Sequence, residues 1–233
     1  MIRTILAIIY SAFWCGAAII ILLIKPNSSD YVLIQLAKKN WSTPMLKWII
    51  GADIQVEFSP KALKLFKSNK GAVIMANHSS FLDIVACFVS SPTPIVYLAK
   101  ASLRKVPLLG GANARVGTVF VNRGNKTSAF NAIKTLVKTV KSGRSVVVFP
   151  EGTRSKDGKL KPFKKGGFHL AVQASAPVLP VHINGTYKRL PPGNFSIKKL
   201  NYPIIVKYGD PIESNDVEEL RNLTYDSISK LRG

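Results

Sequence analysis

The feature that most constrains this chain is an uncharged apolar segment near its beginning. Thr4–Ile24 contains no charged residue and is bounded by Arg3 and Lys25. As a helix it would extend about 31 Å, which is enough to cross the hydrocarbon core of a bilayer. A signal peptide has a shorter apolar region and a small-residue cleavage site, whereas Lys25-Pro26-Asn27 follows here. The sequence therefore predicts a retained membrane segment.

The following segment, Tyr31–Ile50, mixes apolar residues with lysines. Its two tryptophans, Trp41 and Trp48, suit a helix in the headgroup region, and a helix packed on a soluble domain fits equally well. Pro44 argues against one unbroken helix. We expect residues 1–50 to form a two-helix membrane motif ahead of a catalytic domain in residues 51–233.

The distribution of positive charge predicts the side of the membrane. Lys25, Lys38, Lys39 and Lys47 follow the apolar segment, and only Arg3 and the amino terminus precede it. By the positive-inside tendency, the domain after residue 50 should face the cytoplasm. A first helix that crosses the membrane and a hairpin that enters one leaflet both fit. The compact size and the single long apolar segment are typical of a bacterial inner-membrane protein.

The overall charge predicts an anionic partner. The 233 residues include 33 Lys and Arg against 12 Asp and Glu, a net charge of +21, and 47% of residues are hydrophobic. This composition excludes an acidic disordered chain and indicates either nucleic acid or an anionic lipid surface. Binding to nucleic acid would need exposed aromatic residues among the basic ones, but most aromatics here lie in predicted strands or membrane segments. We therefore expect a membrane partner and no nucleic acid.

Short β-rich runs alternate with helical patterns after residue 50. The helical spacing of apolar residues predicts a helix near 129–140, and further helices are expected at Ser80–Ser90, Phe163–Ala174 and Asp216–Leu231. The predicted strands are Ile54–Phe58, Ala72–Ala76, Ile95–Ala99, Thr118–Val121, Ser145–Phe149, Val178–Ile183 and Ile204–Tyr208. This alternation predicts an α/β fold with a mixed, mostly parallel sheet flanked by helices, whose sites form where strands end.

The first motif with chemical content is Asn77–Asp83, where a predicted strand runs into a helix. His78 and Asp83 can meet only if His78 lies in the turn before the helix. Ser80 and Asp83 have the spacing of a helix-capping box, which would produce this turn. An aspartate bound to one imidazole nitrogen leaves the other to take a proton from a hydroxyl. The alternative is a plain helix cap with an incidental histidine.

A metal site is the less favoured use of the same residues. His78, His169, His182 and Asp83 are candidate ligands, but no two histidines have the spacing of a paired metal motif. We therefore expect no metal. No nucleophile with matching spacing accompanies the His–Asp pair, so direct attack by a substrate hydroxyl is more natural than a covalent acyl-enzyme.

Two further strand ends carry arginines. Arg123 follows a predicted strand, and Glu151, Gly152 and Arg154 follow another in the sequence Phe-Pro-Glu-Gly-Thr-Arg-Ser. Two guanidinium groups at neighbouring strand ends suit a phosphate, and glycine allows a close backbone approach. For each arginine alone, a surface salt bridge is the alternative. Two arginines at neighbouring strand ends together favour an anionic substrate.

Together with Val178–Gly185, these blocks resemble in order the 1-acyl-sn-glycerol-3-phosphate acyltransferase (lysophosphatidic acid acyltransferase) family. The resemblance spans His78–Gly185 and implies that His78 and Asp83 form a catalytic dyad. It also implies that the substrate glycerol phosphate is bound by Lys100, Arg123, Glu151, Gly152 and Arg154. The last block, Val178–Gly185, departs from the family pattern at Leu179 and His182. The acyl-chain preference of the family therefore cannot be inferred for this chain from that block.

The resemblance implies transfer of a fatty acyl group to the sn-2 hydroxyl of lysophosphatidic acid. The donor would be acyl-CoA or acyl-carrier protein, used as a co-substrate with no other cofactor, and the product would be phosphatidic acid for phospholipid synthesis. His78 would act as general base, so we expect activity to fall in acid, where the imidazole takes up a proton. Two alternatives are acylation of another lysolipid and a membrane-anchored basic lipid-binding protein without activity.

Overall fold

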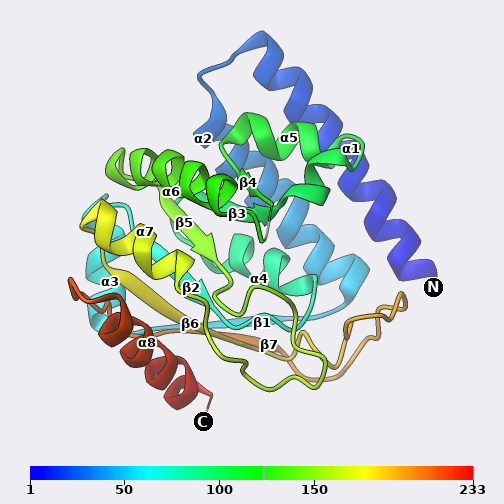
Figure 1. Ribbon diagram of the computed structural model, residues 1–233. Helices are drawn as coiled ribbons and strands as arrows, with labels where there is room; N and C mark the ends of the chain where they lie inside the picture. Colours follow the sequence, from blue (N-terminus) through cyan, green and yellow to red (C-terminus); the bar gives the residue numbers. More distant parts are fainter. Residues whose placement is uncertain (123, 233) are drawn as a thin grey trace.

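A seven-stranded sheet forms the centre of the computed structural model, which describes residues 1–122 and 124–232 (Figure 1). The strands are β1 Ile54–Phe58, β2 Val73–Ala76, β3 Ile95–Lys100, β4 Val119–Val121, β5 Ser145–Val148, β6 Val178–Asn184 and β7 Ile204–Tyr208. Their order is β1-β7-β6-β2-β5-β3-β4, and every neighbouring pair is parallel except β6 and β7. The predicted α/β class and mixed, mostly parallel sheet are confirmed.

The central strands are buried on both faces, which explains their continuous apolar sequences. All residues of β2 and β5 are buried, and in β6 only Asn184 is exposed. β1, at the edge of the sheet, instead alternates half-buried and exposed residues.

Helices cover the two faces of the sheet. The principal ones are α3 Pro60–Lys67, α4 Leu82–Ser90, α5 Leu109–Val116, α6 Lys126–Lys141, α7 Gly166–Ala174 and α8 Val217–Leu231, with a short 3₁₀ turn, η3, at Ala101–Lys105. α6, α7 and α8 pack side by side (Figure 1). α3, α5 and η3 were not among the elements expected from the sequence. Ser59 is the sequence signal for the start of α3, because serine is a preferred N-cap residue. In the structure its side chain caps the helix by accepting the N–H of Ala62.

The register of the strands shows that α4 and α7 lie on opposite faces. Met75 pairs with Val148, and both side chains lie against Gly167 of α7. Tyr97 pairs with Val147, the residue before Val148, so its side chain points to the face opposite that of Met75. The hydroxyl of Tyr97 donates to the carbonyl of Ile84 in α4. Because successive side chains of a strand point to opposite faces, α4 and α7 are separated by the sheet.

The helices before the sheet pack along one side of it. α1 Ile2–Ile24 contacts α5, the π-helix η1 Val32–Ser42 and the π-helix η2 Met45–Ile50, while α2 Ser29–Tyr31 leads into η1. α1 is long and apolar enough to cross a membrane, and most of its large apolar side chains are exposed. These features support membrane association. The boundary between residues 1–50 and 51–233 stays a prediction, and buried residues on both sides of it join the same core.

The expectation that Pro44 interrupts the second helical segment is wrong. The chain is helical from α2 to the end of η2, and Pro44 has helical dihedral angles of φ −65° and ψ −36°. Proline has no N–H to donate, but the segments on both sides of it are π-helices, in which an N–H donates to the carbonyl five residues earlier. The hydroxyl of Tyr10 in α1 also donates to the carbonyl of Asn40, shortly before the proline. The helix therefore continues through Pro44.

The close approach of α6 to the start of β2 predicts a stability effect at Gly71. A Cβ there would lie 2.2 Å from the carbonyl oxygen of Val140 and 2.7 Å from that of Arg144. We expect Gly71→Ala to lower the free energy of unfolding by about 1–3 kcal/mol, because backbone must move. Gly166→Ala is the control, since no atom lies within 4 Å of the corresponding Cβ. Equal thermal unfolding midpoints for the two variants would contradict this prediction.

Candidate active site

The site forms where parallel strands end at one edge of the sheet. β2 leads to His78, and its neighbour β5 leads to Glu151. β3, on the other side of β5, ends at Lys100. Parallel strands bring their carboxyl ends to the same edge, so residues far apart in the sequence become neighbours.

His78 and Asp83 are in contact, as their spacing predicts. Nδ1 of His78 lies 2.9 Å from Oδ2 of Asp83, and the same oxygen accepts the N–H groups of Ser79 at 2.7 Å and Ser80 at 2.8 Å. α4 begins at Leu82, so His78 lies in the turn ahead of it. Because Oδ2 acts as an acceptor, we assign the proton between the two side chains to Nδ1. Nε2 then carries the free lone pair.

The imidazole of His78 is oriented but still accessible. It stacks on the ring of Phe149, with centroids 3.9 Å apart and planes 16° apart. Asp83 is fully buried, whereas the side chain of His78 is 13% exposed. Among the described residues, Nε2 makes no hydrogen bond. The arrangement can therefore accept a proton from a hydroxyl group placed beside Nε2.

Glu151 supports the same loop from β5. One carboxylate oxygen accepts the N–H of His78 at 2.7 Å, and the other accepts the N–H of Lys161 at 3.1 Å. The residue is 3% exposed, and burial raises the pKa of its carboxyl group to about 7, although both hydrogen bonds act in the opposite direction. The side chain predicted to bind substrate thus holds the backbone of His78 and of the 152–165 loop.

Arg154 is joined to the His–Asp loop through Phe81. Its guanidinium carbon lies 3.7 Å from the ring centroid of Phe81, within the range of a cation–π interaction. Gly152 has a positive φ of 73°, and a Cβ there would lie 2.9 Å from the side chain of Lys164. Glycine therefore serves the turn at this position, and the space beside it is filled by a lysine.

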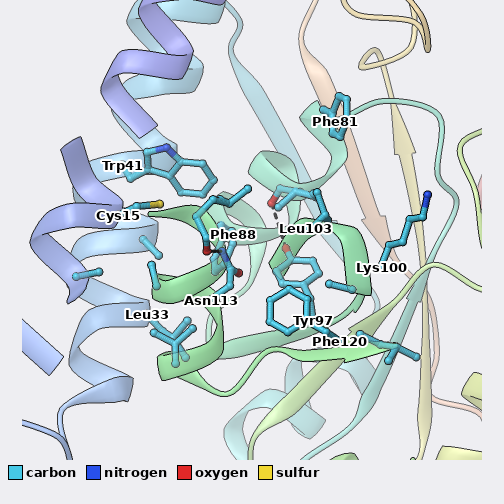
Figure 2. Close-up of a pocket in the computed structure, with 18 of the residues that line it drawn as sticks. Cys15, Leu33, Trp41, Phe81, Phe88, Tyr97, Lys100, Leu103, Asn113 and Phe120 are labelled. Carbon is cyan, nitrogen blue, oxygen red and sulfur yellow. Dashed lines mark hydrogen bonds between the residues drawn. The ribbon is translucent and has the colours of Figure 1, made fainter. Parts of the chain in front are cut away.

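An apolar cavity of about 430 Å³ adjoins the site, and we call it the front cavity. Its lining includes His78, Lys100 and Arg154 as well as side chains from α1, η1, α4, β3 and α5. Figure 2 shows Cys15 and Leu33, from the helical segment, at the end of the lining far from Lys100. One end of the cavity is thus apolar, Lys100 lies at the other, and Arg154 and His78 also belong to the lining.

Some sequence predictions fall outside this cluster. Arg123 lies outside the described residues, so its predicted substrate contact stays a prediction. His182 lies on β6, and His169 is an exposed residue of α7. Within residues 1–122 and 124–232, no cluster of three or more His, Cys, Asp or Glu side chains could hold a metal ion. Phe81 and Phe149 have contacts in the site that the sequence did not predict, although both lie inside the motifs that carry His78 and Glu151.

The buried position of Glu151 predicts a defined pH dependence of stability. Burial raises the pKa of the folded carboxyl to about 7 from 4.5, so its favourable contribution is present below pH 4.5 and is lost as the pH rises through 7. Relative to Glu151→Gln, which does not titrate, wild-type protein should lose thermal stability over this range. Thermal unfolding of both proteins at a series of pH values checks this, and a constant difference would contradict it.

The same variant should lose activity. An amide has one acceptor oxygen, so one buried backbone N–H loses its partner at a cost of about 1–3 kcal/mol, and the His78 loop is loosened. Glu57→Gln is the matched control because that carboxylate lies exposed on β1.

Comparisons with known proteins agree with this geometry. A model of the family described as Acyltransferase matches residues 54–184. A protein named 1-acyl-sn-glycerol-3-phosphate acyltransferase from Cocos nucifera is 36% identical over 176 residues, which cover 75% of this chain and 54% of the relative. One of the same name from Borreliella burgdorferi is 35% identical over 153 residues, or 66% of this chain and 57% of the relative.

A solved structure extends the similarity to the whole fold. The crystal structure of the 1-acyl-sn-glycerophosphate (LPA) acyltransferase PlsC from Thermotoga maritima aligns with a TM-score of 0.74 and 27% identity, covering 100% of this chain and 97% of that one. The chain spans only 54–58% of the length of the first curated relatives. The family model matches more than half of this chain, and the expected resemblance is confirmed by these relatives. The chain belongs to the acyltransferase family.

Proposed function

We propose that the protein transfers a fatty acyl group from a thioester donor to the sn-2 hydroxyl of 1-acyl-sn-glycerol 3-phosphate, forming phosphatidic acid for phospholipid synthesis. One observation carries the proposal: the 2.9 Å contact of His78 with Asp83 lies beside an apolar cavity whose polar end has Lys100 and Arg154. A substrate with a fatty chain, a hydroxyl and a phosphate matches these three features. The names of the relatives support the same acceptor.

The proposed reaction is a single displacement. Nε2 of His78 takes the proton from the sn-2 hydroxyl as its oxygen bonds to the thioester carbonyl carbon, and Asp83 stabilises the imidazolium. When the resulting tetrahedral intermediate collapses, the carbon–sulfur bond breaks and the thiolate takes the proton from the imidazolium. The products are the ester and the free thiol, and His78 is neutral again. No metal and no cofactor beyond the thioester takes part.

The polar end of the front cavity is the proposed site of the acceptor phosphate. Lys100 supplies a flexible point charge, and Arg154 supplies a planar group that can bind two oxygens. Stacking on Phe81 restricts the guanidinium to the side of the His78 loop. In this arrangement the phosphate orients the glycerol so that its free hydroxyl meets the imidazole. The resemblance to the family implies that Arg123 would also bind this phosphate.

The apolar end of the front cavity is the proposed site of a fatty chain. Its wall combines Trp14 and Ala18 of α1 with Leu33 and Leu36 of η1 and Phe88 of α4. The segment that faces lipid thereby also lines the cavity. A lipid substrate can then pass from the membrane to His78 with its chain kept out of water.

The packing of α1 favours attachment to one leaflet. Thr4, near its first residue, accepts the N–H of Ile197 at 3.2 Å, and Asp30 in α2, the next helix after α1, pairs with Arg144 at 2.9 Å. Both ends of a helix about 35 Å long are therefore held by one domain. A crossing helix would have its two ends on opposite sides of the membrane. We propose that the exposed apolar face of α1 lies in the cytoplasmic leaflet of a bacterial inner membrane.

Basic residues near the site suit an anionic donor. The 152–165 loop carries Lys156, Lys159, Lys161, Lys164 and Lys165 next to Glu151. Acyl-CoA and acyl-carrier protein are both anionic, so we propose that this loop faces the donor, and that other lysines face the anionic leaflet.

The direct test is thioester consumption by detergent-purified protein with lysophosphatidic acid as acceptor and acyl-CoA or acyl-carrier protein as donor. We expect acceptor-dependent turnover that falls by about 10²–10⁴-fold in His78→Ala, the usual contribution of a general base. His169→Ala, at an exposed histidine of α7, should retain full activity. Folded wild-type protein that consumes neither donor, or that prefers another lysolipid, would contradict the proposed acceptor.

Arg154→Lys should separate phosphate binding from the chemical step. Lysine keeps the charge but loses the planar group that stacks on Phe81. We expect the KM for lysophosphatidic acid to rise by about tenfold, which corresponds to about 1.4 kcal/mol, with a smaller change in the KM for the donor. Arg221→Lys on α8 is the matched control. An unchanged acceptor KM would remove Arg154 from the phosphate site.

A further inference from the structure

A second cavity, the rear cavity, approaches the His78 loop from the other face of the sheet. It has a volume of about 380 Å³, within the range of small-molecule sites, and its lining includes Ser79, Glu151, His182 and residues of α8. Met75 of β2 pairs with Pro180 of β6, so His182, two residues after Pro180, points to the same face of the sheet as Met75. Met75 lies against α7 on this face. The front cavity lies on the α4 face. The two cavities therefore lie on opposite faces of the sheet, and His78 belongs to the lining of both.

Two side chains of the rear cavity are available for hydrogen bonding. His182 is 9% exposed and Ser79 is 5% exposed, and within the described residues neither side chain is hydrogen-bonded to the protein, while their polar atoms stay open to the cavity. Burial, followed by the charges of Arg232 and Lys207, lowers the pKa of His182 to about 4, so its imidazole is neutral at pH 7. A neutral imidazole and a hydroxyl can each donate and accept. Both groups can therefore bind a polar occupant of the cavity.

The charges around the rear cavity favour an anion. Lys159, from the 152–165 loop, and Arg232, at the end of α8, are exposed and belong to the lining. In the described part of the chain, Glu151 is the only acidic residue of this lining, and both of its oxygens already accept backbone N–H groups. The occupant should therefore combine hydrogen-bonding groups with a phosphate.

We propose that the rear cavity binds the phosphopantetheine arm of the thioester donor. This inference rests on the proposed function, which brings two lipid-like substrates to one imidazole. The front cavity has one apolar end and one pair of cations, and these are assigned to a fatty chain and to the acceptor phosphate. The donor arm has amides, a hydroxyl and a phosphate, and acyl-CoA and acyl-carrier protein share it. His182 and Ser79 match the amides and hydroxyl, while Lys159 and Arg232 match the phosphate.

Binding can be measured without turnover. The chain has 3 histidines, so nuclear magnetic resonance of protein with ¹⁵N-labelled imidazoles gives few signals, and His182→Gln assigns that of His182. We expect unacylated 4′-phosphopantetheine to shift the His182 signal at concentrations where inorganic phosphate does not. Arg232→Gln should weaken this binding by about tenfold. No shift overturns the proposal, and an equal shift with inorganic phosphate replaces the donor arm with a simple anion site.

Kinetics then separate this inference from the proposed function. Lys159→Gln and Arg232→Gln should each raise the KM for acyl-CoA by about tenfold and leave the KM for lysophosphatidic acid unchanged. Lys230→Gln, an exposed residue of α8 outside the rear cavity, is the control. Active variants with an unchanged donor KM overturn the rear-cavity assignment while the acyltransferase proposal stands. A His182 shift in a wild-type protein that does not acylate lysophosphatidic acid supports the donor site and contradicts the proposed acceptor.

Discussion

The buried carboxylate of Asp83 is the interaction on which the site depends. Its Oδ2 atom meets three successive residues, through Nδ1 of His78 and the N–H groups of Ser79 and Ser80. The loop between β2 and α4 cannot change its path without leaving this fully buried carboxylate unpaired, which is costly in a low-dielectric interior. The orientation of the imidazole follows from this loop, and residues of the loop line both cavities.

The neighbouring strand β5 fixes the same loop from its other side. Glu151 accepts the N–H of His78, and the N–H of Ser155 donates to the carbonyl of His78 at 2.7 Å. Both polar groups of the His78 backbone are thus held by the 151–155 segment. Because this segment also carries Arg154, backbone hydrogen bonds connect the proposed general base to the segment of the proposed phosphate ligand. Phe81 completes the connection by stacking on the guanidinium.

Sequence patterns predict the strands and the dyad contact but not the way in which the motifs support one another. The seven apolar runs were recognised because buried strands need apolar side chains, and the spacing of His78, Ser80 and Asp83 dictates the turn. The substrate contact of Glu151, which the resemblance implies, stays a prediction. Its support of the His78 backbone could not be predicted, because a carboxylate in a loop shows no preference for backbone donors in its sequence. The helix through Pro44 is not predicted from the sequence, because proline normally ends a helix and only the structure shows π-helix on both sides of it.

The sequence by itself determined the α/β class, the apolar membrane segment, the order of the motifs and the His78–Asp83 turn. Each of these depends on local spacing or on the polarity of consecutive residues, and both are written directly in the chain. The tertiary structure alone decided that β2 lies between β5 and β6, that residues 1–50 line the front cavity and that a polar cavity lies behind His78. These features depend on contacts between distant segments, and only the packed fold selects which segments meet.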